Sequence, residues 1–307
     1  MPATAVEVHD LKKSYGSLVA VAGITFSVME GEVFALLGPN GAGKTTTVEI
    51  LEGFRHRDAG QVTVLGSDPA KAGRNLKQQM GIVLQSTGLD NYLTVSETVD
   101  MFRGYYPTPR PRDEVIELVG LTEKRDSRVN KLSGGQKRRL DVAIALAGDP
   151  RILFLDEPTT GFDPGAKRQA WEVIKNLARL GKTIFLTSHS MDEVQYLADR
   201  VVIINQGRIV AEGTPATLMA RDQEATTLIR FHVDAGSSLP AAIADLASLH
   251  DGVTEIATED PTRVLYELTS WAVQSNRRLD ALEVVRPSLE DVYLEITASA
   301  GKKETAG

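Results

Sequence analysis

Residues 38–45 read GPNGAGKT, and they indicate the fold class more strongly than any other stretch. A glycine, four residues and then Gly-Lys-Thr are typical of a loop that wraps around phosphate groups. An apolar, strand-like stretch, Val33–Leu37, precedes the loop, and a helical pattern, Lys44–Glu52, follows it. In that order, backbone N–H groups and a helix N-terminus face the bound anion. The stretch therefore predicts a nucleotide-phosphate site rather than an ordinary glycine-rich turn.

The rest of the first two hundred residues alternates between strand-like and helix-like stretches. Strands buried on both faces are predicted at Gly81–Leu84, Ile152–Leu155, Thr183–Thr187 and Val201–Ile204. Helices are predicted at Val95–Tyr105, Asp113–Val119, Gly135–Ala147, Ala166–Leu180 and Met191–Ala198. This alternation predicts an α/β core with a mostly parallel sheet covered by helices. The stretches Val6–Val28 and Gln61–Leu65 predict an added antiparallel β subdomain.

Three regions of the chain are predicted from these patterns. Residues 1–222 are expected to form the α/β core, with a helical subdomain inserted at about residues 88–147, and residues 223–298 a small α+β domain of ferredoxin-like character. Residues 299–307 are expected to be a disordered tail, because they are small and charged. Within the α+β domain the predicted elements are a strand at Thr227–Val233, a helix at Leu239–Leu249, strands near Val253–Ala257 and Val264–Leu268, a short helix, a strand at Leu282–Val285 and a final helix at Leu289–Ile296.

Composition excludes several classes of function. The chain of 307 residues has a net charge of −7 and no cysteine, so disulfides, thiolate metal sites and cysteine nucleophiles are excluded. The acidic balance gives no electrostatic footprint for nucleic acid. No apolar run approaches the roughly 20 residues of a membrane span, and Met1–Asp10 lacks the apolar core of a signal peptide. We expect a cytoplasmic protein that reaches a membrane only through a partner.

A pair of carboxylates follows the predicted strand Ile152–Leu155. Residues 152–158 read ILFLDEP, so Asp156 ends the strand and Glu157 is the next residue. In a phosphate-loop ATPase, an aspartate at such a strand end suits a Mg²⁺ site, and the following glutamate can polarise the attacking water. By itself, the pair is most often a turn or a helix cap. The preceding phosphate loop favours the catalytic interpretation.

A second candidate anion site lies at residues 132–136, which read LSGGQ. A Ser-Gly-Gly turn at a helix N-terminus presents N–H groups and a helix dipole to an anion, and Arg138 and Arg139 add positive charge nearby. In isolation the turn could be an ordinary helix cap. Its place between a phosphate loop and a strand that ends in two carboxylates makes it close to diagnostic of one family.

The chain resembles the ATP-binding subunits of ABC transporters over about residues 4–220. The resemblance implies that Glu157, His189, Lys44 and Gln85 act in ATP hydrolysis, and that Thr45, Gln85 and Asp156 hold Mg²⁺. The implied nucleotide contacts are Tyr15, Gly38, Asn40, Gly41, Gly43, Lys44, Thr45, Thr46, Ser133, Gly134, Gly135, Gln136 and Asp163. Tyr15 corresponds to the aromatic residue that stacks on adenine, and as an alternative it is a packed strand tyrosine.

The resemblance also implies how the subunit works. Members of the family form a head-to-tail dimer, in which ATP on one phosphate loop is covered by Ser133 and Gly135 of the other copy. We therefore expect a homodimer with ATP and Mg²⁺ as cofactors. The expected partner is a separate polytopic permease, contacted through a groove lined by parts of Gln85–Tyr106. The expected location is the cytoplasmic face of the cell membrane, without a membrane span in this chain and without nucleic acid.

Within the family, the chain looks most like the ATPases of daunorubicin-resistance-type multidrug exporters. The stretch Pro287–Leu294, which reads PSLEDVYL, carries this closer likeness. As an alternative, its pattern is simply that of an amphipathic helix with a serine N-cap. Three alternatives stay open: an importer ATPase with a regulatory C-terminal domain, a soluble ATPase that acts on ribosomes or nucleic acid, and a non-catalytic binding module. The presence of both Glu157 and His189 argues against the last.

Overall fold

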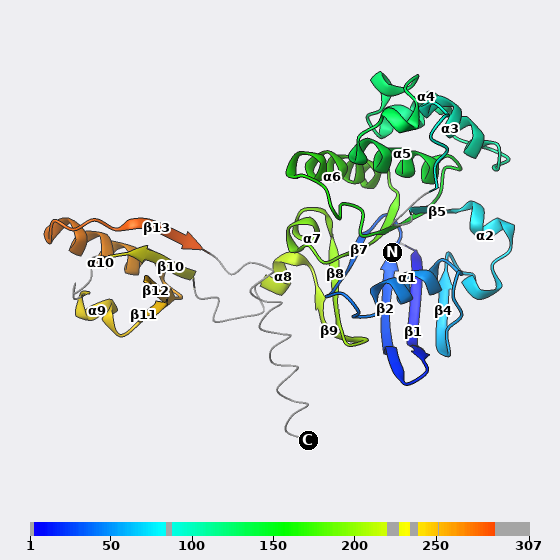
Figure 1. Ribbon diagram of the computed structural model, residues 1–307. Coiled ribbons are helices and arrows are strands. Elements are labelled where there is room, and N and C mark those ends of the chain that lie inside the picture. Colours follow the sequence, from blue (N-terminus) through cyan, green and yellow to red (C-terminus); the bar gives the residue numbers. More distant parts are fainter. Residues whose placement is uncertain (1–2, 84–87, 220–226, 234–238, 251, 286–307) are drawn as a thin grey trace. The chain divides into compact units, whose positions relative to one another are not determined.

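The structure is a computed structural model, and it describes residues 3–83, 88–219, 227–233, 239–250 and 252–285. The chain divides into two compact units, Met1–Pro215 and Ala216–Gly307 (Figure 1). The domain boundary predicted at residues 222/223 stays a prediction. Within the described ranges, none of the helices combines the length and the hydropathy that a membrane span needs.

A six-stranded sheet forms the centre of the first unit. Its strands, in spatial order, are β5 (Met80–Val83), β6 (Ile152–Asp156), β7 (Thr183–Ser188), β3 (Val33–Leu37), β8 (Arg200–Asn205) and β9 (Arg208–Gly213). Neighbouring strands are parallel except β9, which pairs antiparallel with β8. Every residue of β3, β6 and β7 is buried, which accounts for the apolar runs at residues 33–37, 152–155 and 184–186. The predicted parallel sheet is confirmed.

An antiparallel sheet packs on this central sheet, as the sequence predicts. It contains β2 (Leu18–Met29), β1 (Thr4–Tyr15) and β4 (Ala59–Val64), in that spatial order. Four phenylalanines join the two sheets: the ring of Phe34 lies 5.3 Å from that of Phe26 and 5.2 Å from that of Phe185, which lies 5.7 Å from that of Phe154. This buried aromatic cluster fixes the sheets against each other.

Helices cover the central sheet and form the inserted helical region. The first unit contains α1 (Lys44–Leu51), η1 (Pro69–Lys71), α2 (Arg74–Gln78), α3 (Val95–Arg103), α4 (Arg112–Leu118), η2 (Thr122–Lys124), η3 (Val129–Lys131), α5 (Gly134–Leu146), α6 (Pro164–Arg179) and α7 (Met191–Leu197), and α8 (Pro215–Met219) begins where the unit ends. In Figure 1, α3 and α4 lie beyond α5, on the side away from the antiparallel sheet.

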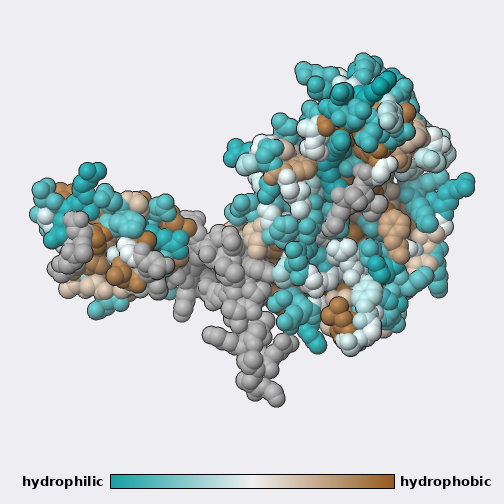
Figure 2. Space-filling view, viewed as in Figure 1, coloured by the Kyte–Doolittle hydropathy of each residue, from teal (hydrophilic) through white to brown (hydrophobic). Residues whose placement is uncertain are grey.

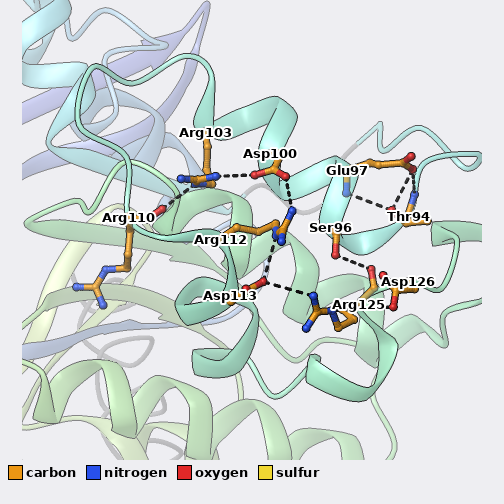
Figure 3. A network of polar contacts seen from close by, with 10 residues as sticks. All are labelled: Thr94, Ser96, Glu97, Asp100, Arg103, Arg110, Arg112, Asp113, Arg125 and Asp126. Atoms are coloured by element: carbon orange, nitrogen blue, oxygen red, sulfur yellow. Dashed lines mark hydrogen bonds and ion pairs between the residues drawn. The ribbon is translucent and has the colours of Figure 1, made fainter.

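Polar contacts hold α3 against α4 (Figure 3). Asp100 of α3 accepts hydrogen bonds from Arg103 at 2.5 Å and from Arg112 of α4 at 2.8 Å. At the start of α3, Thr94 and Glu97 form a capping box that satisfies two backbone N–H groups. The helical region is therefore joined by charged groups at its surface as well as by its small apolar core.

The second unit has the element order β-α-β-β-α-β, which is that of the ferredoxin-like fold. The elements are β10 (Thr227–His232), α9 (Ala241–Ala244), β11 (Ala247–His250), β12 (Val253–Thr258), α10 (Pro261–Gln274) and β13 (Asp280–Val285). The sheet is antiparallel, in the order β11-β12-β10-β13. Its core, built around Ile229, Phe231, Ile256 and Leu268, is separate from that of the first unit.

Two sequence-based predictions in this unit are wrong. Val264–Leu268 was expected to be a strand but lies in α10, where Val264, Leu268 and Ala272 are buried at intervals of four residues. Asp260 caps this helix by accepting from the Arg263 N–H at 3.1 Å. The expected helix Leu239–Leu249 is replaced by the short α9 and by β11, which pairs with β12 in a hairpin.

Several predicted segments lie outside the described residues. They are Gln85, the end of the strand Gly81–Leu84, the helix Leu289–Ile296 with the stretch Pro287–Leu294, and the tail at 299–307.

Candidate functional site

The glycine-rich loop joins β3 to α1 and makes close contacts that require glycine at two positions. A Cβ on Gly38 would lie 2.3 Å from the carbonyl oxygen of Ile204, and a Cβ on Gly43 would lie 2.3 Å from that of Ala20. Gly43 also has a φ of 103°, in the left-handed region that favours glycine. The loop is thus held between β8 and β2, and the N-terminus of α1 faces the space above it.

Lys44, the first residue of α1, is only 5% exposed. Its Nζ donates hydrogen bonds to the carbonyl oxygens of Gly38 at 2.9 Å and Pro39 at 3.1 Å. The same atom lies 3.3 Å from Oε1 of Glu157. The predicted phosphate-binding lysine and the predicted catalytic glutamate are therefore in direct contact, although the chain separates them by more than a hundred residues.

The two carboxylates lie at the end of β6, beside the end of β7. Glu157 has a φ of 46°, a left-handed conformation that costs a non-glycine residue about 1 kcal/mol or more. Thr187 holds this turn, because its Oγ1 accepts from the Glu157 N–H at 3.0 Å and donates to Oδ1 of Asp156. Asp156 pairs with Thr187 in the parallel register of β6 and β7, which makes both contacts possible.

The side chain of Glu157 is held between two basic residues. Its Oε2 lies 3.2 Å from Nδ1 of His189 and accepts from the Thr160 hydroxyl at 3.1 Å, and its Oε1 faces Lys44. Burial raises the pKa of Glu157, but the charge of Lys44, the Thr160 hydrogen bond and His189 outweigh burial and lower the pKa below its ordinary value. Glu157 is therefore ionised at neutral pH and able to accept a hydrogen bond from water.

Asp156 and Thr45 supply oxygen atoms that suit Mg²⁺. Burial raises the pKa of Asp156 above its ordinary value, although the Thr187 hydrogen bond opposes this. A bound cation would stabilise the ionised form. Within the described ranges there is no group of three or more histidine, aspartate or glutamate residues able to hold an ion.

A cavity of about 440 Å³ lies over the glycine-rich loop. Its lining is Tyr15, Leu18, Ala20, Asn40, Gly41, Gly43, Lys44, Thr45, Thr46 and Glu157. Tyr15 ends β1, is 39% exposed, and its hydroxyl lies 3.5 Å from Oγ1 of Thr46. Its exposed ring at the cavity wall argues against the alternative of a packed strand tyrosine.

The LSGGQ segment starts α5 and lines a second, smaller cavity of about 80 Å³. Ser133 is the N-cap: its Oγ accepts from the Gln136 N–H at 3.3 Å, and the Gln136 side chain accepts from the Ser133 N–H at 2.9 Å. The lining is Ser133, Gly135, Gln136, Arg139, Ala166 and Gln169, and it shares no residue with the larger cavity. Both readings of this segment, cap and anion site, are compatible with this geometry.

The two arginines after LSGGQ also make structural contacts, and of the two it is Arg139 that lines the LSGGQ cavity, as the prediction of nearby positive charge requires. Arg138 is buried and donates to the carbonyl oxygen of Asp156 at 3.0 Å, so it connects α5 to the end of β6. Arg139 donates to the carbonyl oxygen of Gly120 at 2.9 Å, at the end of α4. Asp163 is the N-cap of α6 and accepts from the Ala166 N–H at 2.9 Å.

Sequence reasoning missed the residues that hold this site together. Thr187 contacts both carboxylate residues, and Glu193 of α7 accepts hydrogen bonds from three separate segments. No local motif marks them, because a threonine at a strand end and a glutamate in the first turn of a helix are common. Their contacts arise only in the folded chain, where the pairing of β6 with β7 brings the ends of the two strands together.

The fold and the site define an ATP-binding cassette of the phosphate-loop ATPases. A family model described as "ABC transporter" matches residues 21–160. The Nod factor export ATP-binding protein I of Paraburkholderia xenovorans (strain LB400) is 40% identical over 306 residues, which is 97% of this chain and 98% of that protein. The linearmycin resistance ATP-binding protein LnrL of Bacillus subtilis (strain 168) is 36% identical over 305 residues, which is 95% of this chain and 98% of that protein. The chain belongs to the family of ABC transporter ATP-binding subunits, and it is an ATPase.

Solved structures agree with this fold. An ATP-binding subunit of an ABC transporter has a TM-score of 0.62 and 26% identity, over 71% of this chain and 92% of that one. The dimeric cassette MJ0796, in a post-hydrolysis state with ADP and Pi, has a TM-score of 0.61 and 24% identity, over 68% of this chain and 98% of that one.

Proposed function

We propose that this ATPase energises export through a separate membrane permease and that it works as a head-to-tail homodimer. The observation that carries the proposal is the arrangement of two complementary half-sites in one chain. Lys44, Glu157 and His189 meet at the loop above β3, while Ser133 starts a helix that lines a different cavity. Each half-site is completed by the other copy in a dimer with twofold symmetry.

In this proposal each residue of the site has one task. Glu157 orients the attacking water and accepts its proton, while Lys44 and His189 stabilise the charge on the transferring phosphoryl group. Tyr15 stacks on the adenine. Gln85, which lies outside the described residues, is assigned to the metal and the water on the resemblance alone. Thr45 and Asp156 hold Mg²⁺, which neutralises phosphate charge when bound.

The expected contact with the permease is the groove lined by parts of Gln85–Tyr106. In the described part of that range, Tyr92, Met101 and Tyr105 are exposed, with 76%, 45% and 73% of their surfaces accessible. On the face shown in Figure 2, hydrophobic residues are scattered among hydrophilic ones. We place the contact with the partner at the two exposed tyrosines, because tyrosine is enriched at protein interfaces. This partner would place the subunit at the cytoplasmic face of the membrane.

Export is favoured over the importer alternative by the names of the relatives, one for Nod factor export and one for linearmycin resistance. The two names point to different molecules, so we place the choice of cargo in the permease. Export of several drugs by one permease is one kind of export that this proposal includes.

The dimer is tested by mixing two inactive variants. Lys44→Ala removes the phosphate-binding group, and Ser133→Arg blocks the opposing helix N-terminus. Each variant alone is expected to lose hydrolysis. A mixture restores part of it, because a mixed dimer has one site with both halves intact. If the mixture stays inactive although both variants are folded and still associate with each other, the head-to-tail arrangement is wrong.

The permease is tested by purifying the tagged subunit from detergent-solubilised membranes of its host. Recovery of a polytopic membrane protein in near-equal amount supports the transporter role. Recovery only with ribosomes, with nucleic acid or alone contradicts it and leaves the ATPase activity unaffected.

A further inference from the structure

Glu193, in the first turn of α7, is a buried carboxylate that has no task in the mechanism above. It is 1% exposed. Its Oε1 accepts hydrogen bonds from the Thr159 hydroxyl at 2.7 Å and from Nε1 of Trp171 at 3.0 Å, and its Oε2 accepts one from the Ser188 hydroxyl at 2.6 Å. Burial of a carboxylate costs several kcal/mol unless its oxygens are satisfied in this way. Any rearrangement of the three donors therefore carries a large penalty.

The three donors come from segments that contain or adjoin the catalytic groups. Thr159 is two residues after Glu157. Ser188 immediately precedes His189, and its Oγ also accepts from the Ser190 N–H at 2.9 Å, so the hydroxyl spans the turn that presents His189. Trp171 lies on α6, whose N-cap is Asp163. One buried carboxylate thus joins the segment after β6, the turn after β7 and helix α6.

We propose that Glu193 is a positioning residue for ATP hydrolysis. By holding Ser188 and Thr159 on its two oxygens, it fixes the turn of His189 relative to the segment of Glu157. The separation of 3.2 Å between Nδ1 of His189 and Oε2 of Glu157 is the geometry that it maintains. This inference rests on the proposed roles of Glu157 and His189.

A substitution of glutamine for Glu193 separates positioning from simple volume filling. Glutamine has the same shape, but one of its two terminal groups is an NH₂ that can only donate. If the NH₂ takes the place of Oε1, it meets the Nε1–H of Trp171, which can only donate. If it takes the place of Oε2, the Ser188 hydroxyl has to turn from donor to acceptor, and the charged hydrogen bond that holds the turn of His189 is lost. Either arrangement changes the junction while the space in the core stays filled.

The primary test is steady-state ATP hydrolysis by the full chain with Glu193→Gln. A displacement of about 1 Å at a catalytic centre can cost on the order of 10²-fold in rate, so kcat is expected to fall by roughly 10- to 100-fold. KM for ATP is expected to change by less than about threefold, because Lys44 and the phosphate loop are untouched. The matched control is Asp192→Asn, which removes a charge from the same helical turn at an exposed position and leaves kcat unchanged. An unchanged kcat in Glu193→Gln overturns the proposal.

A double variant shows whether Glu193 acts through His189. If it does, His189→Ala combined with Glu193→Gln has the same kcat as His189→Ala alone, whereas independent effects multiply. Multiplied losses with an unchanged thermal midpoint contradict the proposal. If Glu193→Gln does not fold, Ser188→Ala and Thr159→Val each remove one donor, and each is expected to lower kcat without raising KM.

The failure of the proposed function is distinguishable from the failure of this inference. Glu157→Gln is expected to bind ATP and to lose hydrolysis. If Glu157→Gln still hydrolyses ATP, the assigned chemistry is wrong. If Glu157→Gln is inactive and Glu193→Gln is fully active, only the positioning role is wrong.

Discussion

Single residues near the nucleotide site differ in charge state because their surroundings differ. Glu157 faces Lys44 and His189, and its pKa is lowered although burial opposes this. Glu52, which follows α1, is 6% exposed, and burial and then the charges of Asp156 and Glu49 raise its pKa from 4.5 to about 8. One fold thus keeps one glutamate ionised and another neutral at pH 7.

The raised pKa of Glu52 predicts how stability depends on pH. The pKa of this group in the folded state lies above its unfolded value. The contribution of the neutral carboxyl to folding stability is therefore fully present below pH 4.5, and it is lost as the pH rises towards about 8. Glu52→Gln, measured without nucleotide and with chelator, is expected to be more stable than the native chain at pH 8 by on the order of a few kcal/mol. The stabilities of the two proteins should converge below about pH 4.5.

Urea unfolding across this pH range checks the prediction for Glu52→Gln. An equal gain at pH 4 and pH 8 would mean that packing and not charge is responsible. Glu7→Gln, at an exposed position, is the control.

Thr187 is the second residue-scale prediction. Thr187→Val keeps the shape of the side chain but removes the hydroxyl that contacts both Asp156 and the Glu157 N–H. Because catalytic carboxylates misplaced by about 1 Å lose on the order of 10²-fold in rate, kcat is expected to fall by roughly 10- to 100-fold. Thr187→Ser retains the hydroxyl and most of the activity. Equal rates for the valine and serine variants, measured at saturating ATP and Mg²⁺, would rule out the hydroxyl as the cause.

At the scale of elements, both the local sequence pattern and the available pairing partner influence whether a segment forms a helix or a strand. The stretch 264–268 has the β-branched and apolar residues of a strand, but its buried side chains recur every four residues and a Pro261 start with an Asp260 cap favours the helix α10. The sequence Asp251-Gly252 is a hairpin-turn signal between β11 and β12, and Gly252 has a φ of 83°. A two-residue hairpin turn needs a strand directly before it, so this signal should have ended the predicted helix before residue 247.

The contact between α3 and α4 gives a prediction for these elements. Burial raises the pKa of Asp100, but hydrogen bonds from Arg112 and Arg103 outweigh burial and lower it. The stabilisation is therefore present above the ordinary pKa of 3.8 and is lost as the pH falls through the lowered value. Asp100→Asn is expected to cost about 1 kcal/mol or less at pH 7, since the pair is partly exposed.

Urea unfolding at pH 7 and at pH values well below the ordinary pKa of 3.8, at low and high salt, checks this prediction. The cost of Asp100→Asn should shrink at acid pH and in about 1 M salt, where the Debye length is only about 3 Å. Asp126→Asn is the matched control, because the side chain of Asp126 is 87% exposed and 4.0 Å from Arg125. A cost that is the same in all conditions would show that the ion pairs do not provide the stabilisation.

At the scale of the whole molecule, the two units have separate cores, and every described residue of the nucleotide site lies in the first. A fragment of residues 1–222 is therefore expected to fold and to bind ATP with an affinity close to that of the full chain. Calorimetric titration of ATP into both proteins checks this. Loss of ATP binding by a folded fragment would show that the second unit supports the site.

The sequence by itself determined the family, the parallel core and the positions of the phosphate loop, the two carboxylates and the LSGGQ segment. These features are local: each depends on a strand, a tight turn or a helix start whose residues are neighbours in the chain. His189 was identified through the family resemblance and not through a local pattern, and the sequence does not show that it contacts Glu157.

Tertiary structure alone decided which distant residues meet. The spatial order β6-β7-β3 brings Lys44, Glu157 and His189 together, and it gives Thr187 and Glu193 their contacts. It also made Arg138, which was expected to add positive charge near the LSGGQ turn, a buried link to Asp156. The physical reason is that strand order and pairing register depend on burial of the whole sheet, which no short window of sequence contains.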